Sequence, residues 1–293
     1  MSRPKVHVAG AIPEAIEAAL REDFELVAQL RGADGVLSLL TTAVDDRYLE
    51  HAGPQLKVVA NYAVGVNNID LPAAQARGVV VTNTPDVLTK ATAELAITLT
   101  LSLLRRVTEG DRLIRSRTPW KFELEFMLGE SLDGKVFGIV GPGKIGRETA
   151  RLAEAFGATA IFAGRGKLDE LLGEADVVSL HCPLTEETHH LIDAAAFERM
   201  RPTAVLVNTA RGPVVDEQAL LAALRSGTIA GAALDVHEFE PNVTEGLLEI
   251  ENVVLTPHLG SATLATREAM GMLAVSALRA VLLDGVRPAN TVA

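Results

Sequence analysis

The stretch GIVGPGKIG at residues 138–146 decides how this chain folds. It overlaps the end of the apolar run KVFGIVG at 135–141, which is typical of a buried strand, and it leads into the helical pattern RETARLAEAFG. Three glycines at this spacing are a weak signal alone. A strand before them and a helix after them are the context of a dinucleotide-binding turn. The stretch therefore predicts one strand–turn–helix unit of an α/β sheet.

Each residue of this turn has its own part in the predicted site. Gly141 permits the tight turn, Gly143 lets the backbone approach a pyrophosphate, and Gly146 lets the helix pack closely on the strand. The N–H groups of Lys144 and Ile145 would then face the phosphates at the helix N-terminus. The alternative is a tight turn that holds no ligand.

The next strand ends in IFAGRGK at 161–167. In an NAD-specific site an acid at this point binds the ribose hydroxyls and repels a 2′-phosphate. Gly164 removes both effects, and the neighbouring Arg165 offers a planar fork of donors to a phosphate. The stretch predicts a preference for NADP(H), with NAD(H) as the second choice. The alternative is a tight turn with Arg165 in solvent.

Strand-like and helical patterns alternate on both sides of this motif, an order that favours parallel sheets covered by helices. The expected strands are 5–9, 35–40, 57–64, 79–84, 135–141, 160–164, 177–181, 204–210, 231–236 and 252–258. The expected helices include 13–22, 70–78, one long segment from Thr92 to about Arg115, and a last one from about Ala262 to Leu283. The expected fold class is α/β, with two doubly wound units.

The composition excludes several classes of function. The chain has 293 residues and a net charge of −11, which argues against a non-specific nucleic-acid partner. Its one cysteine, Cys182, rules out an intrachain disulfide framework. The N-terminus lacks the apolar core of a signal peptide, and the most apolar helical run, 94–104, is too short to span a membrane. We therefore expect a cytoplasmic protein without a membrane partner.

Polar candidates follow three consecutive expected strands. Arg211 ends one strand, Asp235 ends the next with Glu238 and Glu240 close behind, and His258 ends the third. Open α/β sheets bind ligands at these carboxyl ends. An arginine grips a carboxylate with two parallel hydrogen bonds, and a carboxylate beside a histidine stabilises imidazolium. The alternatives are a surface salt bridge for the arginine and a structural role for the histidine.

Another expected strand ends in HCPLTEETHHLI at 181–192, where Cys182 and Pro183 fall near the predicted cofactor. His181, His189 and His190 lack the HExxH or CxxC spacing of a metal site. No metal is expected.

A series of motifs in this chain resembles, in order, the D-isomer-specific 2-hydroxyacid dehydrogenase family. The motifs are VGVNNID (64–70), TNTPDVLTKATAEL (82–95), GIVGPGKIG (138–146), HCPLTEET (181–188), VNTARGPVVDEQAL (207–220), GAALDVHEFEP (231–241) and NVVLTPHLGSAT (252–263). The resemblance implies a Rossmann nucleotide-binding domain, residues 92–262, inserted into a flavodoxin-like substrate domain, residues 1–91 and 263–293. It also implies a homodimer.

The resemblance further implies roles for the residues that match the family's motifs. His258 resembles the proton donor and acceptor, Glu240 its partner, and Arg211 the arginine that binds the 2-oxo acid and polarises its carbonyl. Val64 and Gly65 resemble the loop that receives the substrate carboxylate. The matching cofactor contacts, beyond the glycine-rich turn and the 164–165 stretch, are Cys182, Pro183, Thr209, Ala210, Asp235, His258 and Gly260.

From the resemblance we expect an enzyme that transfers a hydride from NAD(P)H to a small 2-oxo acid, glyoxylate or hydroxypyruvate first, to give a D-2-hydroxy acid. The alternatives are oxidation of D-3-phosphoglycerate and a non-enzymatic NAD(H)-sensing protein on the same fold. The helix from Thr92 is apolar on all sides, which one domain surface would not cover, so we expect it in a homodimer interface. The alternative is burial between the two domains of one chain.

Overall fold

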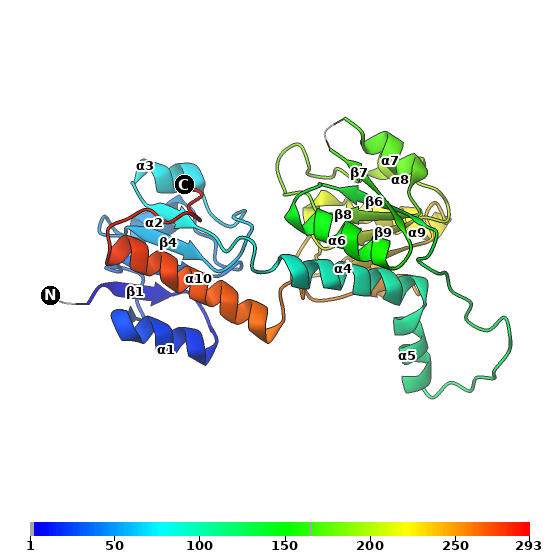
Figure 1. The fold of residues 1–293 in the computed structure, drawn as a ribbon, viewed down its shortest axis with the longest axis horizontal. Coiled ribbons are helices and arrows are strands. Elements are labelled where there is room, and N and C mark those ends of the chain that lie inside the picture. Colours follow the sequence, from blue (N-terminus) through cyan, green and yellow to red (C-terminus); the bar gives the residue numbers. More distant parts are fainter. Residues whose placement is uncertain (1–2, 165) are drawn as a thin grey trace. The chain divides into compact units, whose positions relative to one another are not determined.

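The computed structural model describes residues 3–164 and 166–293 and divides into two compact units. The first unit is Met1–Leu88 with Ala262–Ala293, and the second is Thr89–Ser261. Figure 1 shows that each unit is a sheet covered by helices on both faces. The chain thus leaves its first unit, builds the second, and returns to the first through its last helix.

The sheet of the first unit has five parallel strands in the order β2-β1-β3-β4-β5. Their bounds are Lys5–Val8 (β1), Glu25–Val27 (β2), Gly35–Ser38 (β3), Val58–Asn61 (β4) and Val80–Thr82 (β5). This is the flavodoxin-like order, in which the connections change direction between β1 and β3. The expected doubly wound sheet is confirmed. Sequence patterns missed β2, a short strand at the edge of the sheet.

Helices α1 (Glu14–Asp23) and α10 (Leu264–Leu282) pack against each other on one face of this sheet. On α1 the buried side chains are Ile16, Ala19 and Leu20. Helices α2 (Asp46–Ala52) and α3 (Leu71–Ala76) contribute to the core on the other face. The C-terminal residues run beside β5, where Val292 N donates to Val81 O. The sequence patterns also missed α2, which has only two buried side chains.

The sheet of the second unit has six parallel strands in the order β11-β10-β9-β8-β6-β7. Their bounds are Val136–Val140 (β6), Thr159–Ala163 (β7), Val177–Leu180 (β8), Val205–Asn208 (β9), Gly231–Leu234 (β10) and Val253–Leu255 (β11). The chain moves outward from β6 to β7 and then crosses to β8. The switch point between β6 and β8 is where such sheets bind ligands.

Two apolar cores hold this sheet between its helices. Helices α4 (Thr89–Leu104) and α6 (Lys144–Ala155) pack together on one face, over the β6 side chains Phe137 and Ile139. The other core joins α7 (Leu168–Glu174), α8 (Ala194–Arg199) and α9 (Glu217–Ser226) to the opposite face. Short 3-10 turns at Gly212–Val214 (η1) and Glu245–Glu249 (η2) flank α9 and β10. These layers leave the carboxyl ends of the strands to carry the site.

The prediction of one long helix from Thr92 to about Arg115 is wrong, because the segment forms two helices, α4 and α5 (Val107–Arg115). Arg106 adopts a left-handed conformation with φ of 53°, which no α-helix accommodates. Its guanidinium binds Glu109 one turn further on. Such a reversal depends on local contacts that the apolar pattern does not record.

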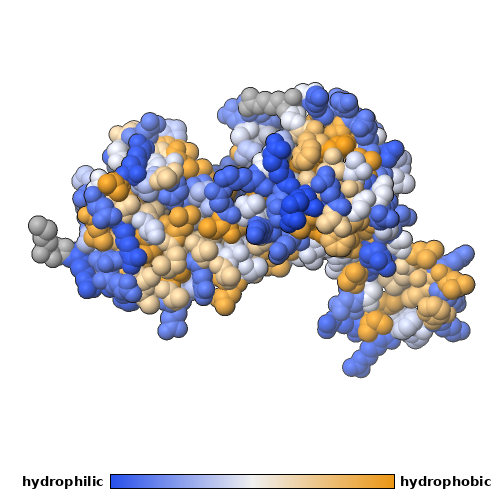
Figure 2. All heavy atoms as spheres, in the orientation of Figure 1, coloured by the Kyte–Doolittle hydropathy of each residue, from blue (hydrophilic) through white to orange (hydrophobic). Residues whose placement is uncertain are grey.

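The unit's own sheet and α6 also cover more of α4 than the sequence predicts. Ile97, Leu99, Leu103 and Leu104 are buried within the unit, and Leu95 and Leu101 are half-buried against the same core. The premise that one domain does not cover this helix is therefore wrong. Exposed apolar side chains lie instead on α5 and the following segment, namely Val107, Ile114, Trp120, Phe122, Leu124, Phe126 and Leu128. We call the stretch 107–128 the apolar arm; orange patches mark it where it projects in Figure 2.

Candidate active site

The glycine-rich turn joins β6 to α6, as expected, and the strand order places it at the switch point of the sheet. Gly141 has φ of +92°, and a Cβ there would lie 2.6 Å from the backbone N of Cys182. A Cβ on Gly146 would lie 2.5 Å from the carbonyl oxygen of Gly141, whereas one on Gly143 would meet nothing within 4 Å. The turn is thus packed against β8 on one side and open at Gly143. An open backbone before a helix N-terminus fits a pyrophosphate.

Uncharged groups lie behind this turn. Burial of the His181 ring lowers its pKa to about 4, and its Nε2 lies 2.9 Å from Ser179 Oγ. Burial also raises the pKa of the Cys182 thiol to about 11. Both side chains are therefore neutral near pH 7. Pro183 follows them at the surface, and its carbonyl accepts from Thr188 Oγ1.

The end of β7 is open, as an adenosine pocket requires. A Cβ on Gly164 would meet no atom within 4 Å, so a larger side chain fits there. The guanidinium of Arg147, in the first turn of α6, lies 5.9 Å from the ring centre of Phe162 on β7. Arg165 lies outside the described residues. Strand β7 ends at Ala163 and helix α7 begins at Leu168, so the connection between them is short.

The strands β9, β10 and β11 are neighbours in the sheet, so their polar candidates lie along one edge. Glu240 Oε2 lies 3.0 Å from Nδ1 of His258, a contact that the predicted acid–base pair requires. Burial of the Glu240 carboxyl acts to raise its pKa. Hydrogen bonds from His258 and from the His237 N–H, with the charge of those imidazoles, outweigh burial, so the pKa lies below its ordinary value. Glu240 is therefore a carboxylate that faces the imidazole.

Arg211 is held beside this pair with an unused donor. Its Nη1 donates to the carbonyl of Ala210 at 2.6 Å, but its buried Nε has no partner among the described residues. Burial lowers the pKa of the guanidinium, and the charge of Glu240 opposes that shift. An unpaired buried donor costs free energy, which a carboxylate ligand would recover. The orphaned Nε therefore fits the expected binding of an acidic substrate.

Asp235 holds the chain segment that carries His258. Its Oδ1 accepts from Thr256 Oγ1 and Leu259 N, and its Oδ2 accepts from Gly260 N at 2.8 Å. His258 itself has φ of 56°, an uncommon conformation for a residue with a side chain. The buried carboxylate thus stabilises a strained turn. The structure places Asp235 behind His258, while its expected contact with the nicotinamide stays a prediction.

Two further expected cofactor contacts lie at the end of β9. Thr209 Oγ1 is buried and without a partner among the described residues, so it has a hydrogen bond to offer a ligand. The N–H of Ala210 donates to Asn208 Oδ1, and Asn208 Nδ2 donates to the carbonyl of Arg211. Sequence reasoning missed Asn208, although it stands in the NTARG motif.

Glu238 does not join the acid–base pair. Its Oε1 lies 2.6 Å from His190 Nε2, and its Oε2 accepts from the N–H of Glu217 at 3.1 Å. Sequence reasoning also missed Glu217, a buried carboxylate that bonds to the segment carrying Glu240. Acidic residues are common in the first turn of a helix, so the sequence gives no sign that Glu217 has this role.

The loop that carries Val64 and Gly65 belongs to the first unit, after β4. Asn83 Nδ2 donates to the carbonyl of Val64, and Asn61 Nδ2 donates to that of Gly65. Because C=O and N–H point in opposite directions in a trans peptide, the N–H groups of Gly65 and Val66 point away from those asparagines. The two asparagines, which the sequence patterns missed, thus orient a pair of backbone donors.

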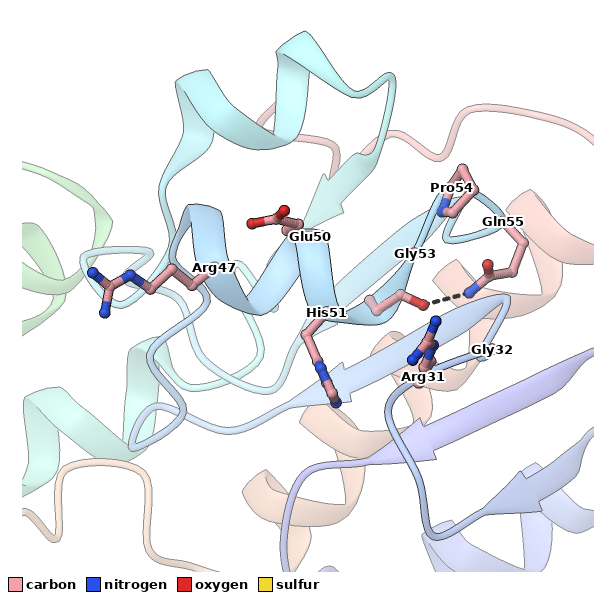
Figure 3. Close-up of a pocket in the computed structure, with 9 residues that line it drawn as sticks. Arg31, Gly32, Arg47, Glu50, His51, Gly53, Pro54 and Gln55 are labelled. Atoms are coloured by element: carbon pink, nitrogen blue, oxygen red, sulfur yellow. Dashed lines mark hydrogen bonds between the residues drawn. The ribbon is translucent and has the colours of Figure 1, made fainter.

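A surface hollow of about 650 Å³ opens elsewhere on the first unit. In Figure 3 the Arg47 side chain points away from Arg31 and His51, and Gln55 binds the backbone of Ala52. These basic side chains are exposed, and none of the expected site residues lines the hollow. A hollow of exposed side chains without a buried polar group is ordinary surface relief. The chemistry lies at the strand ends.

Within residues 3–164 and 166–293, no group of three or more His, Cys, Asp or Glu side chains is placed to hold a metal ion. No helix in the same part of the chain has the length and apolarity to cross a membrane.

A glycine-rich turn at the switch point and a glutamate–histidine pair beyond neighbouring strand ends are typical of a dinucleotide-binding α/β oxidoreductase. The sequence profile of the D-isomer specific 2-hydroxyacid dehydrogenase NAD binding domain matches residues 97–260. A glyoxylate reductase from Pyrococcus furiosus is 43% identical, over 92% of this chain and 90% of that one. The chain belongs to the D-isomer specific 2-hydroxyacid dehydrogenase family.

Solved structures agree over the whole chain. The NADPH-dependent glyoxylate/hydroxypyruvate reductase from Sinorhizobium meliloti, in complex with NADP and malonate, has a TM-score of 0.91 and 37% identity, and the match covers 100% of this chain and 97% of that one. A glyoxylate reductase from Paecilomyes thermophila has a TM-score of 0.90 and 31% identity, with 100% and 99% covered. The second unit is therefore a nicotinamide-dinucleotide-binding domain.

Proposed function

We propose that this protein reduces a small 2-oxo acid, glyoxylate or hydroxypyruvate first, to a D-2-hydroxy acid. The observation that carries the proposal is the Glu240–His258 pair, 3.0 Å apart, beside the unpaired Nε of Arg211. The names of the relatives from Pyrococcus furiosus and Sinorhizobium meliloti support this substrate class.

The residues divide the chemistry among them. Arg211 binds the substrate and polarises its carbonyl. Glu240 holds Nδ1 of His258, so the opposite ring nitrogen, Nε2, is the one that delivers a proton to the carbonyl oxygen. The carboxylate stabilises the imidazolium before that proton leaves. When bound, the nicotinamide dinucleotide supplies the hydride.

The turn with Gly141, Gly143 and Gly146 would hold the pyrophosphate, together with the N–H groups of Lys144 and Ile145. Thr209 and Arg211 each present a buried polar atom without a partner among the described residues, which fits a bound cofactor and an acidic substrate. In the first unit, the loop at Val64 and Gly65 would receive the substrate carboxylate. The proposed substrate domain is residues 1–91 and 263–293, and the proposed dinucleotide domain is residues 92–262.

NADP(H) is the proposed preferred cofactor. The open space at Gly164 supports it, since no acid repels a 2′-phosphate there. The name of the NADPH-dependent Sinorhizobium meliloti relative agrees. The role of Arg165 and the cytoplasmic location stay predictions from the sequence.

A homodimer is the proposed assembly, through the apolar arm rather than through α4 alone. Phe122 and Leu124 in this arm are 82% and 87% exposed. Exposed apolar side chains in this number mark a protein interface, and the rings of Trp120 and Phe126 stack at 6.0 Å within the arm.

The test of function is a panel of 2-oxo acids with NADPH and NADH, each followed by cofactor oxidation. We expect turnover with glyoxylate, which gives an achiral product, or with hydroxypyruvate, which should give the D-configured hydroxy acid. Turnover only with the phosphorylated 2-oxo acid of the D-3-phosphoglycerate couple would favour that rival. Tight binding of the cofactor without turnover on any acid would favour the NAD(H)-sensing rival.

A further inference from the structure

Glu217 is a buried carboxylate at the first turn of α9, 1% exposed and outside the expected catalytic set. Its Oε1 accepts from the backbone N–H of Glu238 at 2.8 Å. Its Oε2 accepts from Thr244 Oγ1 at 2.5 Å and from Thr244 N at 3.3 Å. A buried carboxylate is costly unless such donors satisfy it. Both oxygens are therefore bound to a single segment of chain.

That segment, residues 237–244, carries Glu240 between the two attachment points. Glu238 lies two residues before Glu240 and Thr244 four residues after it. Inside the segment Asn242 N donates to Phe239 O, which makes a tight turn with Glu240 in it. Glu217 thus holds both ends of the turn that presents the Glu240 carboxylate.

Two further contacts fix the same segment. The bonding between Glu217 and Glu238 is reciprocal, because Glu238 Oε2 accepts from the Glu217 N–H. Glu238 Oε1 binds His190. On the other side the η1 turn packs so closely that a Cβ on Gly212 would lie 1.9 Å from the His237 carbonyl oxygen. The segment is thus held from α9, from η1 and from the loop of His190.

His237 links Glu217 to Glu240. Its backbone N–H donates to Glu240 Oε1 at 3.0 Å, and Glu240 Oε2 faces His258. Its ring Nε2 donates to the carbonyl of Thr256, so the ring bridges to the segment that carries His258. Its Nδ1 is buried and lies 3.8 Å from Glu217 Oε1. His237 therefore bonds to the Glu240 carboxylate and to the His258 segment, and its ring lies beside the Glu217 carboxylate without a hydrogen bond to it.

We propose that Glu217 is a positioning residue, which holds residues 237–244 so that the Glu240 carboxylate stays on Nδ1 of His258. This inference rests on the proposed function, because it assigns Glu217 a part in the same acid–base pair. Loss of the Glu217 charge lets the turn relax, and Glu240 then stabilises the imidazolium less. The rate of reduction should then fall away at a lower pH than in the wild type.

Several charged groups surround Glu217 and His258. Glu217 faces His237 and Glu238, with His190 and the N-cap Asp216 beyond them. His258 faces Glu240, with the charge of Arg211 near that carboxylate and Asp235 behind the turn. A pH effect of Glu217 reaches His258 through the position of Glu240, since the groups around His258 are otherwise unchanged.

The test uses three variants of the full chain. Glu217→Gln keeps the size of the side chain but places an NH₂ against the N–H of either Glu238 or Thr244. Thr244→Val removes one donor and keeps the shape. Glu249→Gln is the matched control, since Glu249 is an exposed acid near the same loop. For each we measure kcat and KM for the 2-oxo acid, the Kd of the cofactor by fluorescence, Tm, and the pH profile of reduction.

We expect Glu217→Gln to lower kcat by about 10-fold to 100-fold, part of the roughly 10²–10⁴-fold contribution of general acid catalysis. The alkaline limb of its pH profile should move to lower pH, the cofactor Kd should change less than about twofold, and Thr244→Val should give a smaller shift in the same direction. Glu249→Gln should match the wild type. His258→Ala, run beside them, tests the proposed function separately.

The proposal is overturned if folded Glu217→Gln keeps the wild-type pH profile, whether kcat is unchanged or falls together with cofactor binding. If Glu217→Gln does not fold, Thr244→Val decides: a wild-type profile overturns the proposal and a shifted limb supports it. Full activity of His258→Ala would instead remove the proposed function, whatever Glu217→Gln does.

Discussion

Glu240 and His258 follow different strands, β10 and β11, yet Glu240 Oε2 lies 3.0 Å from Nδ1 of His258. The contact assigns the ring nitrogens, because the one that faces the carboxylate carries a proton there. The other nitrogen is left for the substrate. The Glu240 carboxylate keeps a pKa below its ordinary value, which suits the proposed acid–base role of the pair.

Substitution of the proposed catalytic residues should lower the activity without unfolding the protein. His258→Ala should lower kcat/KM by about 10²–10⁴-fold, the usual range for general acid catalysis. Arg211→Ala should lower it by about 10²–10³-fold, the usual effect of losing a donor that stabilises developing negative charge. In Glu240→Gln the carboxylate no longer stabilises the imidazolium, so the rate of reduction should fall away at a lower pH. Steady-state kinetics from pH 5 to pH 10 checks this, and an alkaline limb that does not move removes Glu240 from that role.

Substitutions at two glycines of the turn should affect cofactor binding and protein stability differently. Gly143→Ala adds a methyl group to open space, so Tm should stay near the wild-type value while the cofactor Kd rises. Gly146→Ala forces a Cβ against a backbone oxygen and should also cost about 1–3 kcal/mol of the free energy of unfolding. Fluorescence titration and thermal melts measure the two effects. Unchanged cofactor affinity in Gly143→Ala would place the pyrophosphate elsewhere.

Cofactor choice should respond to residue 164. Gly164→Asp introduces the missing acid into open space, so the ratio of kcat/KM for NADPH to that for NADH should fall. Arg165→Ala should raise the KM for NADPH more than that for NADH, because only NADPH carries the phosphate. Equal use of both cofactors by the wild type, with no response to Arg165→Ala, would leave this stretch as a turn only.

Acid should destabilise the protein through His181. Its pKa falls from 6.5 to about 4 on folding, so between these values the unfolded chain binds a proton that the folded chain does not. The free energy of unfolding should therefore decrease as the pH falls from 6.5 to 4, by about 2 kcal/mol. In His181→Asn this decrease should be smaller. Denaturant titrations at several pH values test it, and parallel pH dependences for both proteins would exclude His181 as the cause.

The apolar arm should control assembly. The double variant Phe122→Ser, Leu124→Ser should shift the protein from dimer to monomer, because it removes two exposed apolar side chains from the proposed interface. Phe156→Ser, at an exposed apolar residue at the end of α6, is the control and should stay dimeric. Light scattering at micromolar concentration reports the state, and a monomeric wild type would contradict the proposed homodimer.

The sequence alone determined the two parallel sheets, the turn at Gly141, Gly143 and Gly146, and the strand ends that carry Arg211 and His258. These features are local: strand periodicity, glycine conformation and the position of a residue after its strand are encoded within a few neighbours. That these strand ends are neighbours was known only from the strand order in the structure.

Only the tertiary structure decided where α4 ends and what Glu238, Asp235 and Glu217 hold. The family motif pointed to Glu240 as the acid beside His258, but nothing in the sequence showed that Glu238 binds His190. Likewise Glu217 contacts Thr244, 27 residues away along the chain, and no local pattern records such a pair. Long-range hydrogen bonds of buried groups depend on how the loops close over the sheet, so they are known only once the chain has folded.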